Sequence, residues 1–177
     1  MIKKILKRVL GVLVLLLIVF VIVVATRPGE YQVTRSGKIA APPAVVFAQV
    51  NDFNKWEAWS PWAKIDPQMK KTIEGPAGVG ATYHWVGNKD VGEGRMTIAE
   101  SQTNDFVRIK LEFIKPFESV CATEIAFKGE GNDTTVTWSM SGTNGFVAKA
   151  FCMFMDMDKM IGADFEKGIA QMRTVSE

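Results

Sequence analysis

The chain has 177 residues, 47% of them apolar, which suits about one globular domain and excludes a disordered or collagen-like polypeptide. The formal net charge is +2, but Lys3, Lys4, Lys7 and Arg8 supply four positive charges at the start, so the remainder carries +2 − 4 = −2. A near-neutral body argues against nucleic acid as a partner. One histidine and two cysteines are too few ligands for a zinc site. We expect no metal and no other cofactor.

The N-terminal segment contains a long apolar run. Residues 9–25 are all strongly apolar except Gly11. A helix of this length rises about 1.5 Å per residue and nearly spans a hydrocarbon core of about 30 Å. The run predicts a transmembrane anchor over residues 1–26 and a linker over 27–30. A cleaved signal peptide, whose apolar region is usually about 7–15 residues long, and a buried helix of a soluble domain are the alternatives.

The charges around this run predict its orientation. The four N-terminal cations favour a cytoplasmic N-terminus under the positive-inside rule. We therefore expect a single-pass membrane protein whose domain, residues 31–177, lies on the far side of the membrane. In a bacterium this is the periplasmic side of the inner membrane.

The first part of the domain combines one strand with helical segments. Residues 31–39 alternate apolar and polar side chains, which predicts a strand with one wet face. Pro42 and Pro43 end the strand and open a short helix, because proline fits the first helical turn. A second helical segment is predicted over residues 52–62. Its Trp59 and Trp62 are candidates for contact with the membrane interface, with burial in the core as the alternative.

The middle of the chain predicts six strands separated by glycine-rich turns. Short connections between successive strands imply an antiparallel meander. The expected spans are residues 70–74, 81–86, 95–100, 106–114, 119–128 and 135–141.

The C-terminal segment, residues 146–175, predicts one long amphipathic helix that covers the apolar face of the sheet. At 100° per residue its apolar side chains form one stripe. The stripe consists of Phe151, Phe154, Met157, Ile161, Phe165, Ile169, Met172 and Val175.

Several short segments carry a family resemblance. They are IAAPPAVVF at 39–47, VNDFNKW at 50–56, WSPW at 59–62, GVGA at 78–81, GEGRM at 92–96, TVTW at 135–138 and GADFEKG at 162–168. With the order of the elements, they make the chain similar to the START-like (SRPBCC) superfamily and its polyketide cyclase/dehydratase-like group. The resemblance implies an α+β helix-grip fold, in which a curved antiparallel seven-stranded sheet wraps on a long C-terminal helix.

The resemblance also implies a function. Members of the superfamily hold hydrophobic ligands between sheet and helix, so the expected partners are a hydrophobic small molecule or lipid and the membrane. A polyketide cyclase-like enzyme, and a non-catalytic interaction domain with a filled core, are the alternatives. No catalytic residue is assigned. The residues expected to bind the ligand are Trp85, Arg95, Trp138, Asp158, Ile161 and Phe165.

A few polar residues need partners if they are buried. Catalysis would have to use His84, Arg95 and Asp158. Asp158 lies at the edge of the apolar stripe, and a buried carboxylate there needs a partner. Arg95 is the expected one, with His84, a tryptophan indole, or exposure at the rim as alternatives. Cys121 and Cys152 are either paired or free.

Overall fold

The structure, a computed structural model, describes residues 2–177 and divides into two compact units. One unit combines the chain up to Tyr31 with Thr143–Asp156. The other combines Gln32–Gly142 with Met157–Glu177 and contains nearly all of the sheet.

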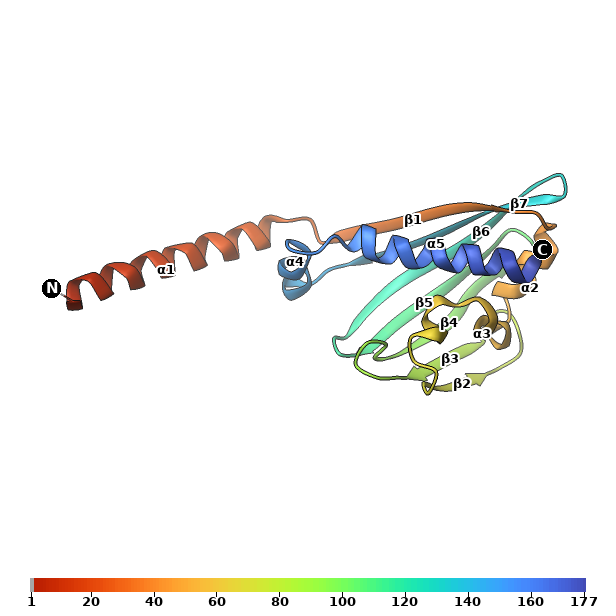
Figure 1. Cartoon of the computed structure of the whole chain (residues 1–177), viewed down its shortest axis with the longest axis horizontal. Helices are drawn as coiled ribbons and strands as arrows, with labels where there is room; N and C mark the ends of the chain where they lie inside the picture. Colours follow the sequence, from red (N-terminus) through yellow and green to blue (C-terminus); the bar gives the residue numbers. More distant parts are fainter. Residues whose placement is uncertain (1) are drawn as a thin grey trace. The chain divides into compact units, whose positions relative to one another are not determined.

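The larger unit is built on a seven-stranded sheet with the order β1-β7-β6-β5-β4-β3-β2, shown in Figure 1. Consecutive strands from β2 to β7 pair antiparallel, so the predicted meander and helix-grip fold are confirmed. Because β-branched and aromatic residues alternate with polar ones, each strand except the short, exposed β2 has one buried face. The strands are β1 (Glu30–Ile39), β2 (Lys70–Glu74), β3 (Thr82–Val86), β4 (Glu93–Gln102), β5 (Phe106–Lys115), β6 (Ser119–Glu130) and β7 (Asp133–Thr143).

Helices fill the connection between β1 and β2. The helix α2 (Pro43–Val50) starts at Pro43, as predicted. The expected helix over residues 52–62 is instead three short turns, because Ser60 is extended and Pro61 begins a new turn. These turns are η1 (Phe53–Lys55), α3 (Trp56–Trp59) and η2 (Pro61–Lys64).

The predicted single C-terminal helix is two helices. The structure has α4 (Phe146–Cys152) and α5 (Met157–Ser176), with turn residues between them. Asp156 directly precedes α5, and aspartate is favoured at that position because its side chain accepts hydrogen bonds from the first helical amides. The prediction of a continuous stripe is therefore wrong before Met157. Phe154 is 79% exposed rather than buried in the core.

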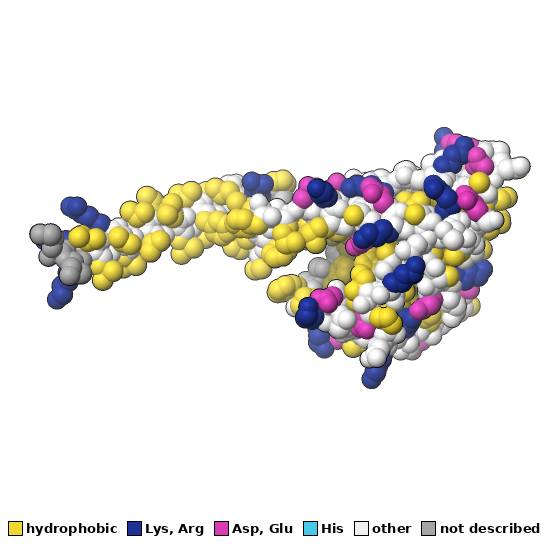
Figure 2. Space-filling view, viewed as in Figure 1, with side chains coloured by type: hydrophobic (Ala, Val, Ile, Leu, Met, Phe, Trp, Pro, Cys, Tyr) yellow, Lys and Arg dark blue, Asp and Glu magenta, His cyan; other side chains and the backbone are white. Residues whose placement is uncertain are grey.

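The N-terminal helix α1 (Ile2–Thr26) is apolar and, for the side chains described, almost wholly exposed. Its segment Lys3–Thr26 is long and apolar enough to cross a membrane, a property that a signal sequence shares. The space-filling view shows this helix as a continuous apolar surface with cations near its start (Figure 2).

Candidate functional site

The inner face of the sheet becomes less buried from one end of its strands to the other. Val107, Ile125 and Trp138 form one row across β5, β6 and β7 and are all buried. Two rows further along the strands, Leu111 and Gly142 flank buried Cys121 and are only half-buried. Phe113, on the next row, is also half-buried. The inner face therefore opens toward the Leu111 and Phe113 end, and Figure 2 shows hydrophobic side chains on the floor of a hollow in the molecule.

Aromatic stacking closes the interior at its buried end. Trp138 on β7 stacks on Phe165 of α5, with ring centroids 4.4 Å apart and an interplanar angle of 7°. Trp59 and Trp62 contact the same indole edge-on at 5.7 and 5.9 Å. Gly168 allows this close approach, because a Cβ there would lie 2.6 Å from Trp138. The stacked pair fixes α5 against the sheet.

Trp138 also holds a buried donor without an acceptor. Its side chain is only 2% exposed, and its Nε1 has no hydrogen-bond partner among the described residues. Among the described residues, two other buried polar atoms lack a hydrogen-bond partner. They belong to Gln171 and Ser176, in the C-terminal part of α5. Most buried donors are paired, because an unpaired one costs about 1–3 kcal/mol. An acceptor from outside the chain would satisfy the indole.

An arginine from β1 holds the N-terminal half of α5. Arg35 shares the inner face of β1 with buried Val33. Its guanidinium donates to both carboxylate oxygens of Asp158, at 3.1 and 2.9 Å, and to Glu166 at 2.9 Å. Gly162 has no side chain, and a Cβ there would collide with the guanidinium. Hydrogen bonds from Arg35 lower the pKa of Asp158 below its ordinary value.

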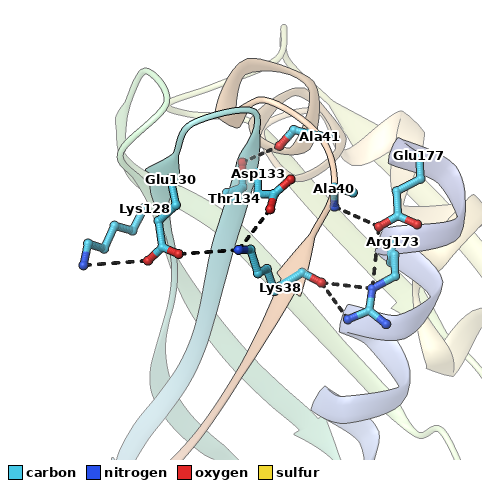
Figure 3. Close-up of polar contacts among 9 residues, drawn as sticks. All are labelled: Lys38, Ala40, Ala41, Lys128, Glu130, Asp133, Thr134, Arg173 and Glu177. Atoms are coloured by element: carbon cyan, nitrogen blue, oxygen red, sulfur yellow. Dashed lines mark hydrogen bonds and ion pairs between the residues drawn. The ribbon is translucent and has the colours of Figure 1, made fainter.

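A second set of polar contacts holds the other end of α5 (Figure 3). Arg173 donates from Nε and Nη2 to the carbonyl oxygen of Lys38, at 3.0 and 2.6 Å. The Ala40 N–H donates to Glu177 Oε1 at 2.8 Å. The helix is thus tied to β1 near both of its ends, with the aromatic stack between them.

The predicted ligand-binding residues are only partly brought together. Trp138 and Phe165 are in contact, and Ile161 is half-buried one turn before Phe165 on α5. Trp85 is buried on β3, where it packs on Phe113 at 6.1 Å and donates to a carbonyl oxygen at 3.3 Å. A ligand role for these residues stays a prediction.

The expected pairing of Arg95 with Asp158 is wrong. Arg95 follows Gly94, which is buried on β4, so its side chain lies on the outer face and donates to Glu112 at 3.0 and 3.1 Å. His84 pairs in register with Arg95, and its Nε2 lies 3.6 Å from Glu93. The structure therefore does not bring together the three residues that catalysis would have needed.

Sequence reasoning missed Arg35, although a signal was present. In the alternation over residues 31–39, the apolar Tyr31, Val33 and Ile39 share one face, and Arg35 falls on the same face. A cation in an apolar series needs an acidic partner, and Asp158 had been recognised as a carboxylate in need of one.

These features define an α+β helix-grip protein whose long helix is fastened over a curved sheet. The chain belongs to the family described as polyketide cyclase/dehydrase and lipid transport, which it matches over residues 30–177. No curated protein matches its sequence.

Solved structures share the fold at low sequence identity. Protein CV1439 from Chromobacterium violaceum aligns with a TM-score of 0.59 and 13% identity, covering 85% of this chain and 99% of that one. The Aha1 protein from Colwellia psychrerythraea, solved as a dimer, gives 0.59 and 14%, covering 83% and 96%. The di-domain ARO/CYC protein StfQ of the steffimycin pathway gives 0.64 and 9%, covering 84% of this chain and 51% of StfQ.

Proposed function

We propose that this protein is a membrane-anchored START-like domain that binds a hydrophobic small molecule or lipid between the sheet and α5. The observation that carries the proposal is the buried, unpartnered Nε1 of Trp138. A ligand with an apolar body and one acceptor oxygen fits such a site, because ligand sites in proteins combine apolar walls with few polar groups.

The lining of the open end supports an apolar ligand. Met96, Leu111 and Phe113 are half-buried on the inner face of β4 and β5, and Met140 lies beside the Trp138 row. Methionine and aromatic side chains adapt to irregular apolar shapes. Arg35, which contacts the N-terminal half of α5, is already neutralised by two carboxylates, so its charge does not favour an anionic group on the ligand.

Binding without catalysis is the function we favour. A catalytic site needs titratable groups that converge on the ligand. His84 and Arg95 lie on the outer face of the sheet, whereas Asp158, on α5, forms an ion pair with Arg35 of β1. The half-buried residues named above are apolar and supply no acid, base or nucleophile.

The anchor would keep the domain at a source of apolar ligand. We propose that α1 spans the membrane with its N-terminus in the cytoplasm, because the cations of the first eight residues precede the apolar run. Alkaline phosphatase fused after Glu177 should be active in bacterial cells. Activity of a cytoplasmic reporter at the same position would contradict this orientation.

Photocrosslinking tests the ligand site. The full chain is reconstituted into vesicles that contain a lipid with a diazirine on its acyl chain, irradiated, and mapped by peptide mass spectrometry. Crosslinks within α1 are the internal control for insertion. We expect a second group of crosslinks on the inner face, at Leu111, Phe113 and Ile161.

Two variants sharpen this test. Leu111→Trp should fill the half-buried end of the inner face and remove the interior crosslinks while those in α1 persist. Trp138→Phe keeps an aromatic ring against Phe165 but removes the indole donor, so it should weaken the interior crosslinks. Crosslinks confined to α1 in the wild-type protein, at every acyl length tried, would overturn the proposed site.

A further inference from the structure

The short helix α4 and the turn after it expose large apolar side chains. Val147 is 70% exposed and Phe154 is 79% exposed, and both Phe146 and Phe151 are also exposed. At about 100° per residue, Phe146, Val147 and Phe151 lie within an arc of roughly 140° on α4. A contiguous apolar surface of this kind marks an interaction site.

The opposite side of α4 is the one that faces its own unit. Lys149 lies over Gly29, because a Cβ at Gly29 would be 3.2 Å from Lys149 Cε. The Asn144 backbone N–H donates to the Gly29 carbonyl oxygen at 2.8 Å, and Asn144 Nδ2 lies 3.7 Å from Cys152 Sγ. On α4 the half-buried residues are the small Ala148, Ala150 and Cys152 together with Lys149, whereas the large apolar side chains are exposed, the reverse of the arrangement expected in water.

The contact between α4 and α1 shows beside which part of α1 this apolar surface lies. The two helices pack within one compact unit. On α1, Val24 is fully buried and Phe20, one turn earlier on the same side, is half-buried, whereas the large apolar residues from Ile5 to Val19 are exposed. Phe20 lies only about 9 Å before the end of the helix at Thr26. The headgroup region on each side of a bilayer is about 5–8 Å thick, so α4 lies at interfacial depth if α1 spans the membrane.

We propose that residues 146–154 dock into the headgroup–acyl boundary of the leaflet from which α1 emerges, with Phe146, Val147, Phe151 and Phe154 inserted among the lipid chains. This inference rests on the proposed membrane anchor. The occupant is lipid, because the apolar surface of α4 continues from the apolar surface of α1, which itself requires lipid. Docking would give the anchor a second contact with the bilayer.

Spin-label accessibility tests the docking in the full chain. In a Cys121→Ala, Cys152→Ala background, single nitroxides are placed through Val147→Cys or Phe154→Cys, and the protein is reconstituted into phosphatidylcholine–phosphatidylglycerol vesicles. A label at Val79→Cys is the matched control, because Val79 is 60% exposed on a turn of the other unit. A label at Leu16→Cys reports insertion of α1. Circular dichroism and thermal unfolding check that each variant is folded.

The measured quantity is the accessibility of each label to oxygen, which concentrates in the bilayer, and to a water-soluble nickel chelate. We expect the labels at 147 and 154 to favour oxygen, as the label at 16 does, and the label at 79 to favour nickel. If 147 and 154 behave like 79 while 16 is in lipid, the docking is wrong and the anchor stands. Shielding of 147 and 154 from both reagents indicates a protein partner and also overturns the proposal. A water-exposed label at 16 overturns both anchor and docking.

Discussion

Replacing Phe165 with alanine should cost much of the stability of the domain. The phenyl ring is 2% exposed and stacks on Trp138 at 4.4 Å. Replacing a buried phenylalanine with alanine typically lowers the free energy of unfolding by about 3–5 kcal/mol. The loss is largest where the neighbouring side chains cannot move into the cavity. Trp59, Trp62 and the backbone of Gly168 confine Trp138 here, so we expect about 4–5 kcal/mol.

The assay is urea unfolding of the full chain in detergent micelles, followed by tryptophan fluorescence, because Trp138 should change its environment when α5 separates from the sheet. Phe154→Ala is the matched control. Its ring is exposed, so the free energy of unfolding should change by less than about 0.5 kcal/mol. Equal effects of the two substitutions, or a loss below about 1 kcal/mol for Phe165→Ala, would refute the packing of α5 through this stack.

Three further predictions concern the same unit. Gly168→Ala should destabilise by about 1–2 kcal/mol in urea unfolding, because the clash with Trp138 outweighs the gain of about 1 kcal/mol in helix propensity. Burial raises the pKa of Tyr83 to about 12 from 10.0, so the unfolded state loses its proton first. Stability should fall as the pH rises from 10 to 12, and Tyr83→Phe should flatten that part of the profile. Arg35 lowers the pKa of Asp158. The stability that this contact contributes is therefore complete above the ordinary aspartate pKa of 3.8 and is lost as the pH falls below that value. Asp158→Asn should therefore weaken the acid dependence of the thermal midpoint, and an unchanged acid profile would argue against the Arg35 contact.

Alternation along the strands was sufficient to predict the sheet. Val107 and Ile109 are buried while Arg108 and Lys110 between them are exposed, as a period of two requires. The same rule, applied to β4, would have placed Arg95 on the outer face beside Glu112, because buried Gly94 precedes it. The mistaken pairing of Arg95 with Asp158 matched two opposite charges but ignored the alternation that determines on which face of β4 Arg95 lies.

Helical periodicity was less informative at the start of the C-terminal segment. Phe151 and Phe154 fit the stripe that includes Phe165, yet both are exposed and the helix breaks before Met157. A periodic pattern shows that residues share a face but not what covers that face. For Trp59 the sequence left two alternatives open, and the structure supports burial in the core rather than contact with the membrane. Trp59 is fully buried in the aromatic cluster, and composition does not distinguish an interfacial tryptophan from a core one.

Native mass spectrometry of the full chain, released from lipid nanodiscs, tests the binding of an apolar ligand most directly. We predict that the wild-type protein retains one apolar molecule per chain and that Leu111→Trp loses it without loss of thermal stability beyond the roughly 1–3 kcal/mol expected for a larger side chain. A wild-type protein without bound ligand, or equal retention by both proteins, would contradict a ligand site between the sheet and α5.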